Sequence, residues 1–264
     1  MAGEPKMGVM QRPLLADVAT FLRFYSRLPI GMGAHAPLDF ARMALALPIA
    51  GAVIGATGAA ALIFACICHL PVLICALVAI AGLAFATGAL HEDGLADVAD
   101  GFGGGSTRES KLAIMRDSRI GAYGVLALCF SILLRVAALV SILERSVTLA
   151  ALSLIFAGAL SRVAGLAPML WLSPARVDGL GATVAAPSRE AWGRACLIAA
   201  AFGVAPWFAG ASASQVAVAI IAAFSVAALV AKLAKREIGG YTGDVLGTAQ
   251  QLAEIAILAA LSAA

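Results

Sequence analysis

The chain has 264 residues, of which 62% are hydrophobic and 12% are charged, and its formal net charge is +3. Soluble domains carry about a quarter charged residues, so this composition excludes a water-soluble globule and predicts an integral membrane protein. The first 30 residues are mixed and charged, which is untypical of a signal peptide. Because no polar linker interrupts the chain, we expect one membrane-embedded domain over residues 1–264.

The hydrophobic runs predict an all-α, polytopic helical bundle with about six to seven transmembrane helices, since about 20 residues of helix cross the hydrocarbon. Before them, residues 14–27 alternate apolar and charged side chains. They predict an amphipathic helix that either lies in the membrane interface or packs on the bundle from the cytosol, within an N-terminal interfacial segment, residues 1–40. The predicted spans are residues 42–67, 71–90, 121–142, 147–171, 195–211, 214–231 and 245–263.

The basic residues predict the orientation of the bundle. Most of the 18 lysines and arginines fall in the N-terminal segment or in the connections near 91–120, 172–194 and 232–244. The positive-inside rule then places these segments and the N-terminus in the cytosol. We expect the net positive charge to serve topology and anionic ligands, because no pattern typical of nucleic-acid binding is present.

The five cysteines lie in apolar stretches without metal-type spacing. They predict small hydrophobic side chains buried in lipid, and neither disulfides nor a zinc site is expected.

An acidic segment, "LHEDGLADVADGFGGG" (90–105), follows the second hydrophobic run. On a helix continuing from that run, Asp93, Asp97 and Asp100 fall within a stripe about 60° wide, and Glu92 points away from it. Three neighbouring carboxylates repel one another unless a cation lies between them. The spacing therefore predicts an Mg²⁺ or Mn²⁺ site that takes further oxygens from water and a substrate phosphate. For His91, a supporting hydrogen bond and a plain interfacial position stay open.

The next segment combines glycines with basic residues. Gly103 and Gly104 predict an open turn, and Ser106 with Glu109 predicts a capping box for a helix over 107–119. A glycine turn before a helix N-terminus can hold anions, so we expect phosphate binding there. Arg116 and Arg119, with Asp117 between them, are candidates for completing a diphosphate site. For Lys111, phosphate binding and an ordinary basic loop are equally compatible with the sequence.

The last charged segment precedes and enters the final span. Asp244 follows a glycine-rich turn that contains Thr242, and a ligand-binding role and a helix N-cap are both expected for this aspartate. Glu254 lies inside a membrane helix, where a carboxylate needs a polar cavity or a partner. Arg135 and Arg162 are the candidate partners, and the sequence leaves open whether such a pair is structural or functional.

Three of these segments together resemble a known family. "HEDGLADVADGFGGG", "IMRDSRIGAYG" and "GGYTGDVLGTAQQLAEI" are similar to the signature segments of the cobalamin synthase family, the adenosylcobinamide-GDP ribazoletransferases. The stretch "FLRFYSRLP" and the residues Pro48, Gly51 and Gly55 are also similar to that family. The resemblance covers nearly the whole chain in the same order.

The resemblance implies the last assembly step of cobalamin biosynthesis in the cytoplasmic (inner) membrane. The family joins adenosylcobinamide-GDP to α-ribazole or its 5′-phosphate, releases GMP and requires Mg²⁺. Asp93, Asp97 and Asp100 then hold the metal, and Asp117 or Asp244 completes the coordination or accepts the hydroxyl proton. The remaining candidates bind the diphosphate or the leaving GMP: Arg116, Arg119, Lys111, Gly103, Gly104 and Thr242.

Two other functions are also compatible with the sequence. "DVADG" has the Asp-x-x-Asp-Gly spacing of CDP-alcohol phosphotransferases, which make phospholipids, but glycines stand where that motif continues with Ala-Arg. An ion-coupled transporter with Asp244 and Glu254 as a relay is the other alternative, although no internal repeat is visible. A homo-oligomer and an association with other corrinoid-pathway enzymes also stay open.

Overall fold

The computed structural model describes residues 14–31, 38–179 and 183–263. Within these ranges the regular structure is helical, apart from one isolated parallel bridge between Pro174 and Tyr241. The elements are α1 (Leu14–Tyr25), α2 (Phe40–Met43), η1 (Ala44–Ala46), α3 (Leu47–Ile67), α4 (Val72–Thr87), α5 (Leu90–Gly104), α6 (Arg108–Ile114), α7 (Ala122–Arg145), α8 (Val147–Gly165), α9 (Ala167–Trp171), α11 (Arg189–Ala201), α12 (Val204–Phe208), α13 (Ala213–Ile238) and α14 (Gly243–Ser262).

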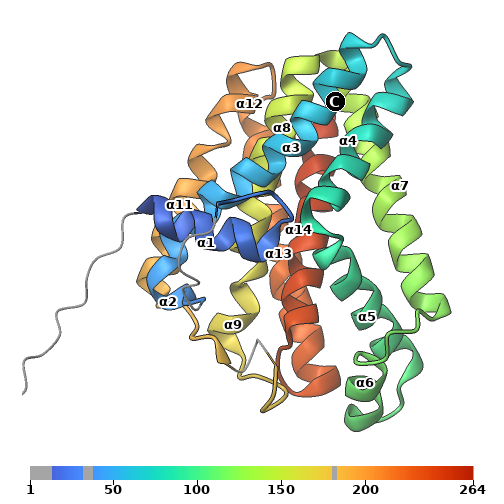
Figure 1. Ribbon diagram of the computed structural model, residues 1–264, viewed down its shortest axis with the longest axis vertical. Coiled ribbons are helices and arrows are strands. Elements are labelled where there is room, and N and C mark those ends of the chain that lie inside the picture. The colour runs from blue at the N-terminus through green and yellow to red at the C-terminus, as the bar shows by residue number, and fades with distance from the viewer. Residues whose placement is uncertain (1–13, 32–37, 180–182, 264) are drawn as a thin grey trace, which may run out of the picture.

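The described chain forms a membrane-type helical bundle, as predicted (Figure 1). Six segments are long and apolar enough to cross a bilayer, and α4 with α5 makes a seventh if this bent pair counts as one span. The six are Ala44–Ile67, Ala122–Arg145, Val147–Trp171, Arg189–Phe208, Ala213–Ile238 and Gly243–Ser262. The cytosolic N-terminus stays a prediction, because the fold alone does not orient the bundle.

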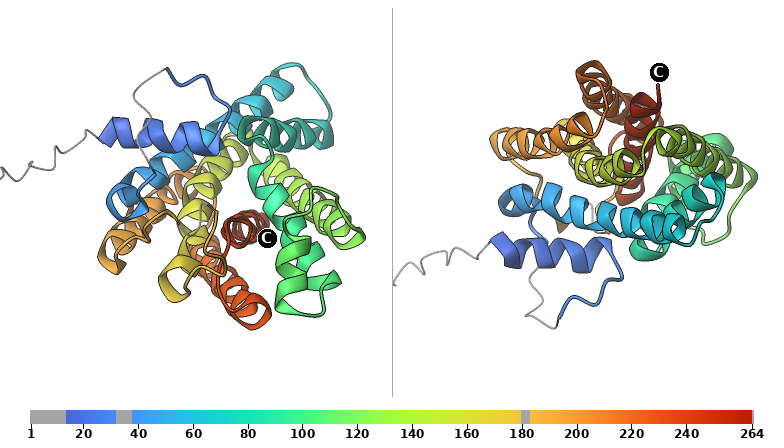
Figure 2. Two further views of the ribbon diagram at one scale, coloured as in Figure 1. Left: turned by 60° about the horizontal axis from the view of Figure 1, so that its bottom comes forward. Right: turned by 90° about the horizontal axis from the view of Figure 1, so that it is seen from above.

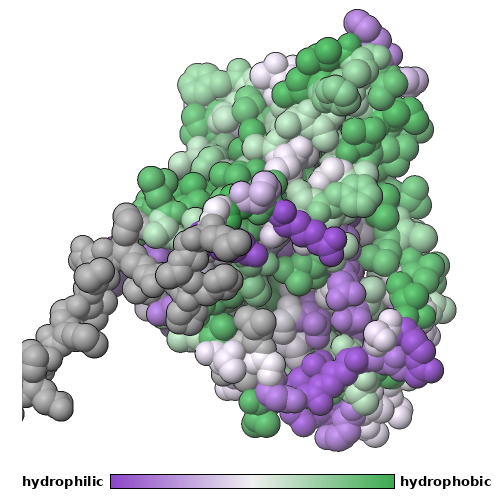
Figure 3. All heavy atoms as spheres, viewed as in Figure 1, coloured by the Kyte–Doolittle hydropathy of each residue, from purple (hydrophilic) through white to green (hydrophobic). Residues whose placement is uncertain are grey.

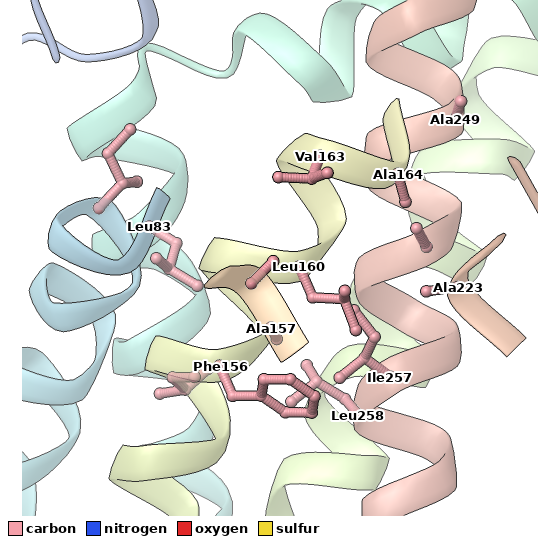
Figure 4. Close-up of a cluster of buried hydrophobic side chains, with 14 of the residues drawn as sticks. Leu83, Phe156, Ala157, Leu160, Val163, Ala164, Ala223, Ala249, Ile257 and Leu258 are labelled. Atoms are coloured by element: carbon pink, nitrogen blue, oxygen red, sulfur yellow. The ribbon is translucent and has the colours of Figure 1, made fainter. Parts of the chain in front are cut away.

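Helix α14 occupies the centre of the bundle. It packs against α5, α7, α8 and α13, which surround it when the molecule is viewed along the bundle (Figure 2). Small and branched side chains fill this interior: Phe156 and Leu160 of α8 lie beside Ile257 and Leu258 of α14 (Figure 4). The final span of the sequence is therefore a core helix, together with α8, which explains why its polar residues must find partners inside the protein.

Glycines let α3 and α8 approach backbone to backbone. A Cβ built on Gly51 would lie 2.3 Å from the carbonyl oxygen of Gly158, and one on Gly55 would lie 2.4 Å from that of Leu154. There is no room for a side chain at either glycine. Such close contact between backbones is expected where membrane helices meet through small residues. The glycine content of the first span thus fixes its contact with α8.

The acidic helix does not continue straight from the second hydrophobic run, and that part of the prediction is wrong. Gly88 and Ala89 both take positive φ values, 63° and 57°, and α5 is bent by 89° from α4. The side chain of Arg27 covers this bend, since a Cβ on Gly88 would lie 2.4 Å from its Nε atom. A single glycine in an apolar run is a weak signal, because helices tolerate it.

Several predicted boundaries also needed correction. The helix expected over 107–119 is α6, which ends at Ile114, and its capping box uses Thr107 and Ser110 in place of Ser106 and Glu109. The fifth span begins at Arg189 after the N-cap Ser188, and α13 continues to Ile238 instead of residue 231. Hydropathy follows the part of a helix that faces lipid, whereas these helices extend past it into polar surroundings.

Polar side chains gather at one end of the molecule (Figure 3). Lys111 of α6 pairs with Glu237 at the end of α13, and Arg116 pairs with Asp178 of the connection after α9. The charged connections predicted to share one face are therefore in contact with one another. The candidate site lies between them and the centre of the bundle.

Candidate active site

A cavity of about 370 Å³ opens between α1, α5, α8, α9, the connection after α9 and α14. Acidic and basic side chains line it together, namely Asp93, Asp244, Arg162 and Arg176. Its apolar wall includes Tyr25 and other aromatic and aliphatic side chains. A concave, mostly apolar site with a few converging charged groups is typical of a small-molecule site.

The acidic end of this cavity is built from two helices. Asp93 of α5 and Asp244 in the first turn of α14 line the cavity. Asp97 lies one turn further along the same face of α5 and is outside this lining. The helices meet at Gly94, where an added Cβ would lie 3.0 Å from the carbonyl oxygen of Asp244. Thr248 holds the same contact by donating its hydroxyl hydrogen to the carbonyl oxygens of Gly94 (3.0 Å) and Asp244 (2.8 Å).

The glycine-rich turn before α14 gives Asp244 its position. Thr242 is the N-cap of α14: its Oγ1 accepts from the amide of Val245 (3.3 Å) and donates to Oδ2 of Asp244 (3.1 Å). The N-cap expected at Asp244 therefore belongs to Thr242, which leaves the aspartate carboxylate facing the cavity. Tyr241 also exchanges backbone hydrogen bonds with Ser173 and Ala175, which fastens the connection after α9 to this turn.

The acids repel one another, and one arginine partly compensates them. Partial burial and then the charges of Asp93, Asp244 and Asp100 raise the pKa of Asp97 to about 7, while Arg176 opposes that rise. Nη2 of Arg176 lies 3.4 Å from Oδ2 of Asp244, and its buried Nε has no partner. A negative cluster with this residual repulsion favours a bound cation.

Carboxylate oxygens are the type of ligand that a hard divalent ion such as Mg²⁺ prefers. No three His, Cys, Asp or Glu side chains among the described residues are close enough to share one metal ion. Mg²⁺, however, usually takes one or two carboxylates and completes its shell with water and substrate phosphates. One or two of the carboxylates of Asp93, Asp97 and Asp244 therefore offer enough protein oxygens for an ion that arrives with a diphosphate.

Asp100 has a different position from the other predicted metal ligands. Its two carboxylate oxygens accept hydrogen bonds from the amides of Gly121 (2.7 Å) and Gly124 (2.8 Å), at the N-terminus of α7. Neither glycine leaves room for a Cβ beside that carboxylate. Asp100 thus anchors α7 to α5, and the spacing that placed it on the stripe could not show this long-range contact.

The basic loop after α6 lies at the rim of the site. Arg116 donates to both carboxylate oxygens of Asp178 at 2.6 Å, and Asp178 lines the cavity. Arg119 and Asp117 pair with each other, and these hydrogen bonds lower the pKa of Asp117 to about 2. Of the predicted residues in this loop, Arg116 is thus next to the cavity, whereas Asp117 and Arg119 are outside its lining.

The expected glycine turn begins later than predicted, because α5 continues through Gly103 and Gly104 and the chain leaves the helix only at Gly105. The space beside Gly103 is filled by the ring of Tyr123, which would lie 2.7 Å from an added Cβ. Lys111 forms an ion pair with Glu237 and also lies outside the lining of the cavity. Because helical amides are used within the helix, these glycines do not form the anion cradle that their sequence predicted.

A buried polar network lies behind the cavity. Arg135, 1% exposed, binds Oε1 of Glu92 (3.1 Å) and Oε1 of Glu254 (3.4 Å). In the amide orientation that satisfies its neighbours, Gln251 also accepts from Arg135 at 2.8 Å. Glu254 thus pairs with Arg135, and the network joins α5, α7 and α14. Arg162, the other candidate partner, lies between this network and the cavity: it lines a small second cavity with Glu254 and also lines the main one.

Two further residues of the cavity were not among the predicted site residues. Arg176 was noted only as part of a connection, and nothing in the sequence placed it beside Asp244. Tyr25 of α1 lies on His91, with ring centroids 5.5 Å apart and an interplanar angle of 14°. The run "FLRFYSRLP" was the only signal for this residue, because its similarity to a family segment marks it without giving it a role.

Comparison with known proteins identifies the same family that the sequence motifs resemble, over almost the whole chain. A family model described as cobalamin-5-phosphate synthase matches residues 17–262. Three similar proteins are each named adenosylcobinamide-GDP ribazoletransferase. The chain is 49% identical over 253 residues to the one from Azorhizobium caulinodans, 47% over 258 residues to that from Xanthobacter autotrophicus, and 43% over 248 residues to that from Bradyrhizobium diazoefficiens.

These alignments cover 92–94% of this chain and 93–94% of each of the three relatives. No solved structure matches the chain.

Proposed function

The chain belongs to the cobalamin-5-phosphate synthase family, and we propose that its acid-lined cavity is where the corrinoid diphosphate is transferred. The reaction joins adenosylcobinamide-GDP to α-ribazole or its 5′-phosphate in the assembly of cobalamin. One observation supports placing the reaction in this cavity: Asp244 of α14 lies close to Asp93 and Asp97 of α5, with Arg176 beside them.

The transfer exchanges one phosphorus–oxygen bond for another. A ribose hydroxyl of the acceptor attacks the phosphorus that carries the corrinoid's aminopropanol arm. The bond between that phosphorus and the bridging oxygen breaks, the electron pair stays on the oxygen, and GMP leaves. The hydroxyl proton passes to a carboxylate or to water. Positioning and charge neutralisation supply most of the catalysis in such transfers.

The residues of the cavity can perform these tasks. One or two of Asp93, Asp97 and Asp244 would hold Mg²⁺, which when bound supplies neutralisation of the diphosphate charge. With a pKa of about 7, Asp97 is partly ionised near neutral pH, and in that ionised form its carboxylate can accept the hydroxyl proton. Arg176 and, at the rim, Arg116 are placed to neutralise the GMP that leaves.

We propose that the cavity opens at the cytosolic face of the inner membrane, and the same arrangement supports this orientation. The cavity lies at the end of the bundle where the basic connections meet, and such connections face the cytosol in membrane proteins. GDP-activated substrates are cytosolic compounds, so the predicted orientation gives them access. Neither a phospholipid-forming enzyme nor an ion-coupled transporter is needed to explain this site.

The proposal predicts that Asp97→Asn and Asp244→Asn each reduce GMP release by about 100-fold or more. The measurement uses detergent-solubilised protein with adenosylcobinamide-GDP and α-ribazole, with and without Mg²⁺. Each variant removes a charge from the metal site but leaves the helix contacts in place. Glu190→Gln is the matched control, because Glu190 is an exposed carboxylate on α11 outside the cavity.

Two results would contradict the proposal. The first is normal turnover of both variants, which would move the chemistry away from this cavity. The second is full activity after removal of divalent ions with EDTA. Release of CMP from CDP-diacylglycerol, or ion flux into vesicles without any GMP release, would support one of the alternative functions.

A further inference from the structure

The structure assigns Arg162 to a second anion subsite in the same cavity: we propose that its guanidinium binds the 5′-phosphate of the acceptor nucleotide. This inference rests on the proposed function, because it takes the acidic end of the cavity as the place of transfer. It adds a specificity residue for which the sequence suggested only an ion pair with Glu254.

Arg162 is a buried cation with unused donors. It is 4% exposed, its Nη1 donates to the carbonyl oxygen of Gly158 (3.0 Å), and its Nε has no partner. Glu92 and Glu254 line a second, small cavity together with Arg162, but the ion pairs that the structure shows for both carboxylates go to Arg135. A buried guanidinium that shares its carboxylates with another arginine is incompletely compensated, and an anionic ligand would satisfy it.

The cavity becomes more enclosed from its acidic end to Arg162. Asp93 is exposed and Asp244 is half-buried, whereas His91 and Arg162 are 5% and 4% exposed. Gly247 of α14 faces His91, and Gln250 packs on Gly165, one turn from Arg162 on α8. Asp244 and Gln250 are six residues apart, so the helical rise separates the two ends by about 9 Å.

This separation suits a ribose phosphate lying along the cavity. Its phosphate would meet Arg162 at the enclosed end, and its ribose hydroxyl would reach toward the acids at the open end. The aromatic rings of Tyr25 and His91 lie beside this path, where a flat base could pack. Arginine presents a planar set of hydrogen-bond donors that matches the oxygens of a phosphate. Arg162 therefore favours a phosphate over a neutral group at this end of the cavity.

The diphosphate of the donor is the other possible source of the anion. A cavity of about 370 Å³ is at the small end of ligand sites and matches a nucleotide-sized molecule. The corrinoid is several times larger, so the donor must remain mostly outside with only its diphosphate at the mouth. The enclosed end is therefore left for the acceptor.

The test compares acceptors with and without the 5′-phosphate in the wild-type protein, Arg162→Met and Arg162→Lys. We expect Arg162→Met to raise the KM for α-ribazole 5′-phosphate by about 10- to 100-fold. The KM for α-ribazole and for the donor should stay within about twofold, with little change in kcat. Arg162→Lys should give an intermediate KM, because it keeps the charge but loses the planar donors.

Arg145→Met is the control, since this arginine binds the carbonyl oxygens of Leu261 and Gly210 and is outside the lining of the cavity. An equal loss with both acceptors, or a raised KM for the donor alone, would overturn the role of Arg162.

Direct titration calorimetry with α-ribazole 5′-phosphate and no donor tests the subsite even if turnover fails. Weaker binding of this nucleotide to Arg162→Met would support it, and unchanged binding would overturn it. Absence of GMP release by the wild type would instead count against the proposed function.

Discussion

At the residue scale, the acidic segment contains carboxylates with three different tasks. Glu92 belongs to the buried network with Arg135, Asp100 caps α7, and Asp93 lines the site with Asp97 close behind it. The four acids occur within nine residues of one helix. Their tasks differ because neighbouring positions on a helix point to different partners, about 100° apart.

The raised pKa of Asp97 predicts how metal binding depends on pH. A carboxyl with a pKa of about 7 is mostly protonated at pH 6, and a bound proton competes with a divalent ion. We expect the apparent affinity for Mg²⁺ to rise about tenfold per pH unit below pH 7 and to level off above it. Mg²⁺ titration of the enzyme at pH 5.5 to 8.5, with GMP release as the signal, measures this. A constant affinity between pH 5.5 and 7 would contradict it.

At the element scale, the contact between α5 and α14 controls the site. Gly94 allows the two helices to approach, and Thr248 bonds across them. The bend at Gly88 and Ala89 directs α5 into this position. The acidic stripe would not meet Asp244 if α5 simply continued the axis of α4.

Gly94→Ala is therefore expected to damage activity more than a helical glycine normally would. Its Cβ would lie 3.0–3.1 Å from backbone atoms of Asp244, which cannot move without shifting α14. We expect GMP release to fall by about tenfold or more, by displacement of the acids. Gly193→Ala is the control, because that glycine of α11 has open space beside it and alanine favours a helix by about 1 kcal/mol. Equal activity of the two variants would show that the contact does not position the site.

At the scale of the whole molecule, the bundle separates an apolar part from one polar end. The ion pairs Lys111–Glu237 and Arg116–Asp178 gather distant connections there. The connection between α3 and α4 lies at the opposite end (Figure 1). This asymmetry is what the positive-inside rule uses to orient a membrane protein.

The orientation predicts opposite labelling of two cysteines. Cys68 is exposed beside the α3–α4 connection, and Ser118→Cys would lie in the exposed loop after α6. With the other four cysteines replaced, a membrane-impermeant maleimide should label Cys68 in cells with a permeabilised outer membrane. With all five native cysteines replaced, Ser118→Cys should be labelled only in inside-out vesicles. The reverse pattern would place the site on the outer face of the membrane.

The sequence by itself determined the membrane bundle, the helical acidic segment and the family. These depend on local properties: about 20 apolar residues span a bilayer, carboxylates spaced by three and four share a helix face, and long motifs resemble known ones. Only the tertiary structure decided that Asp244 faces Asp93, that Asp100 caps α7, and that Glu254 binds Arg135 while Arg162 lines the cavity. Those pairings join positions far apart in the chain, and which partners meet is set by the bend after α4 and by how closely the glycine-bearing helices pack.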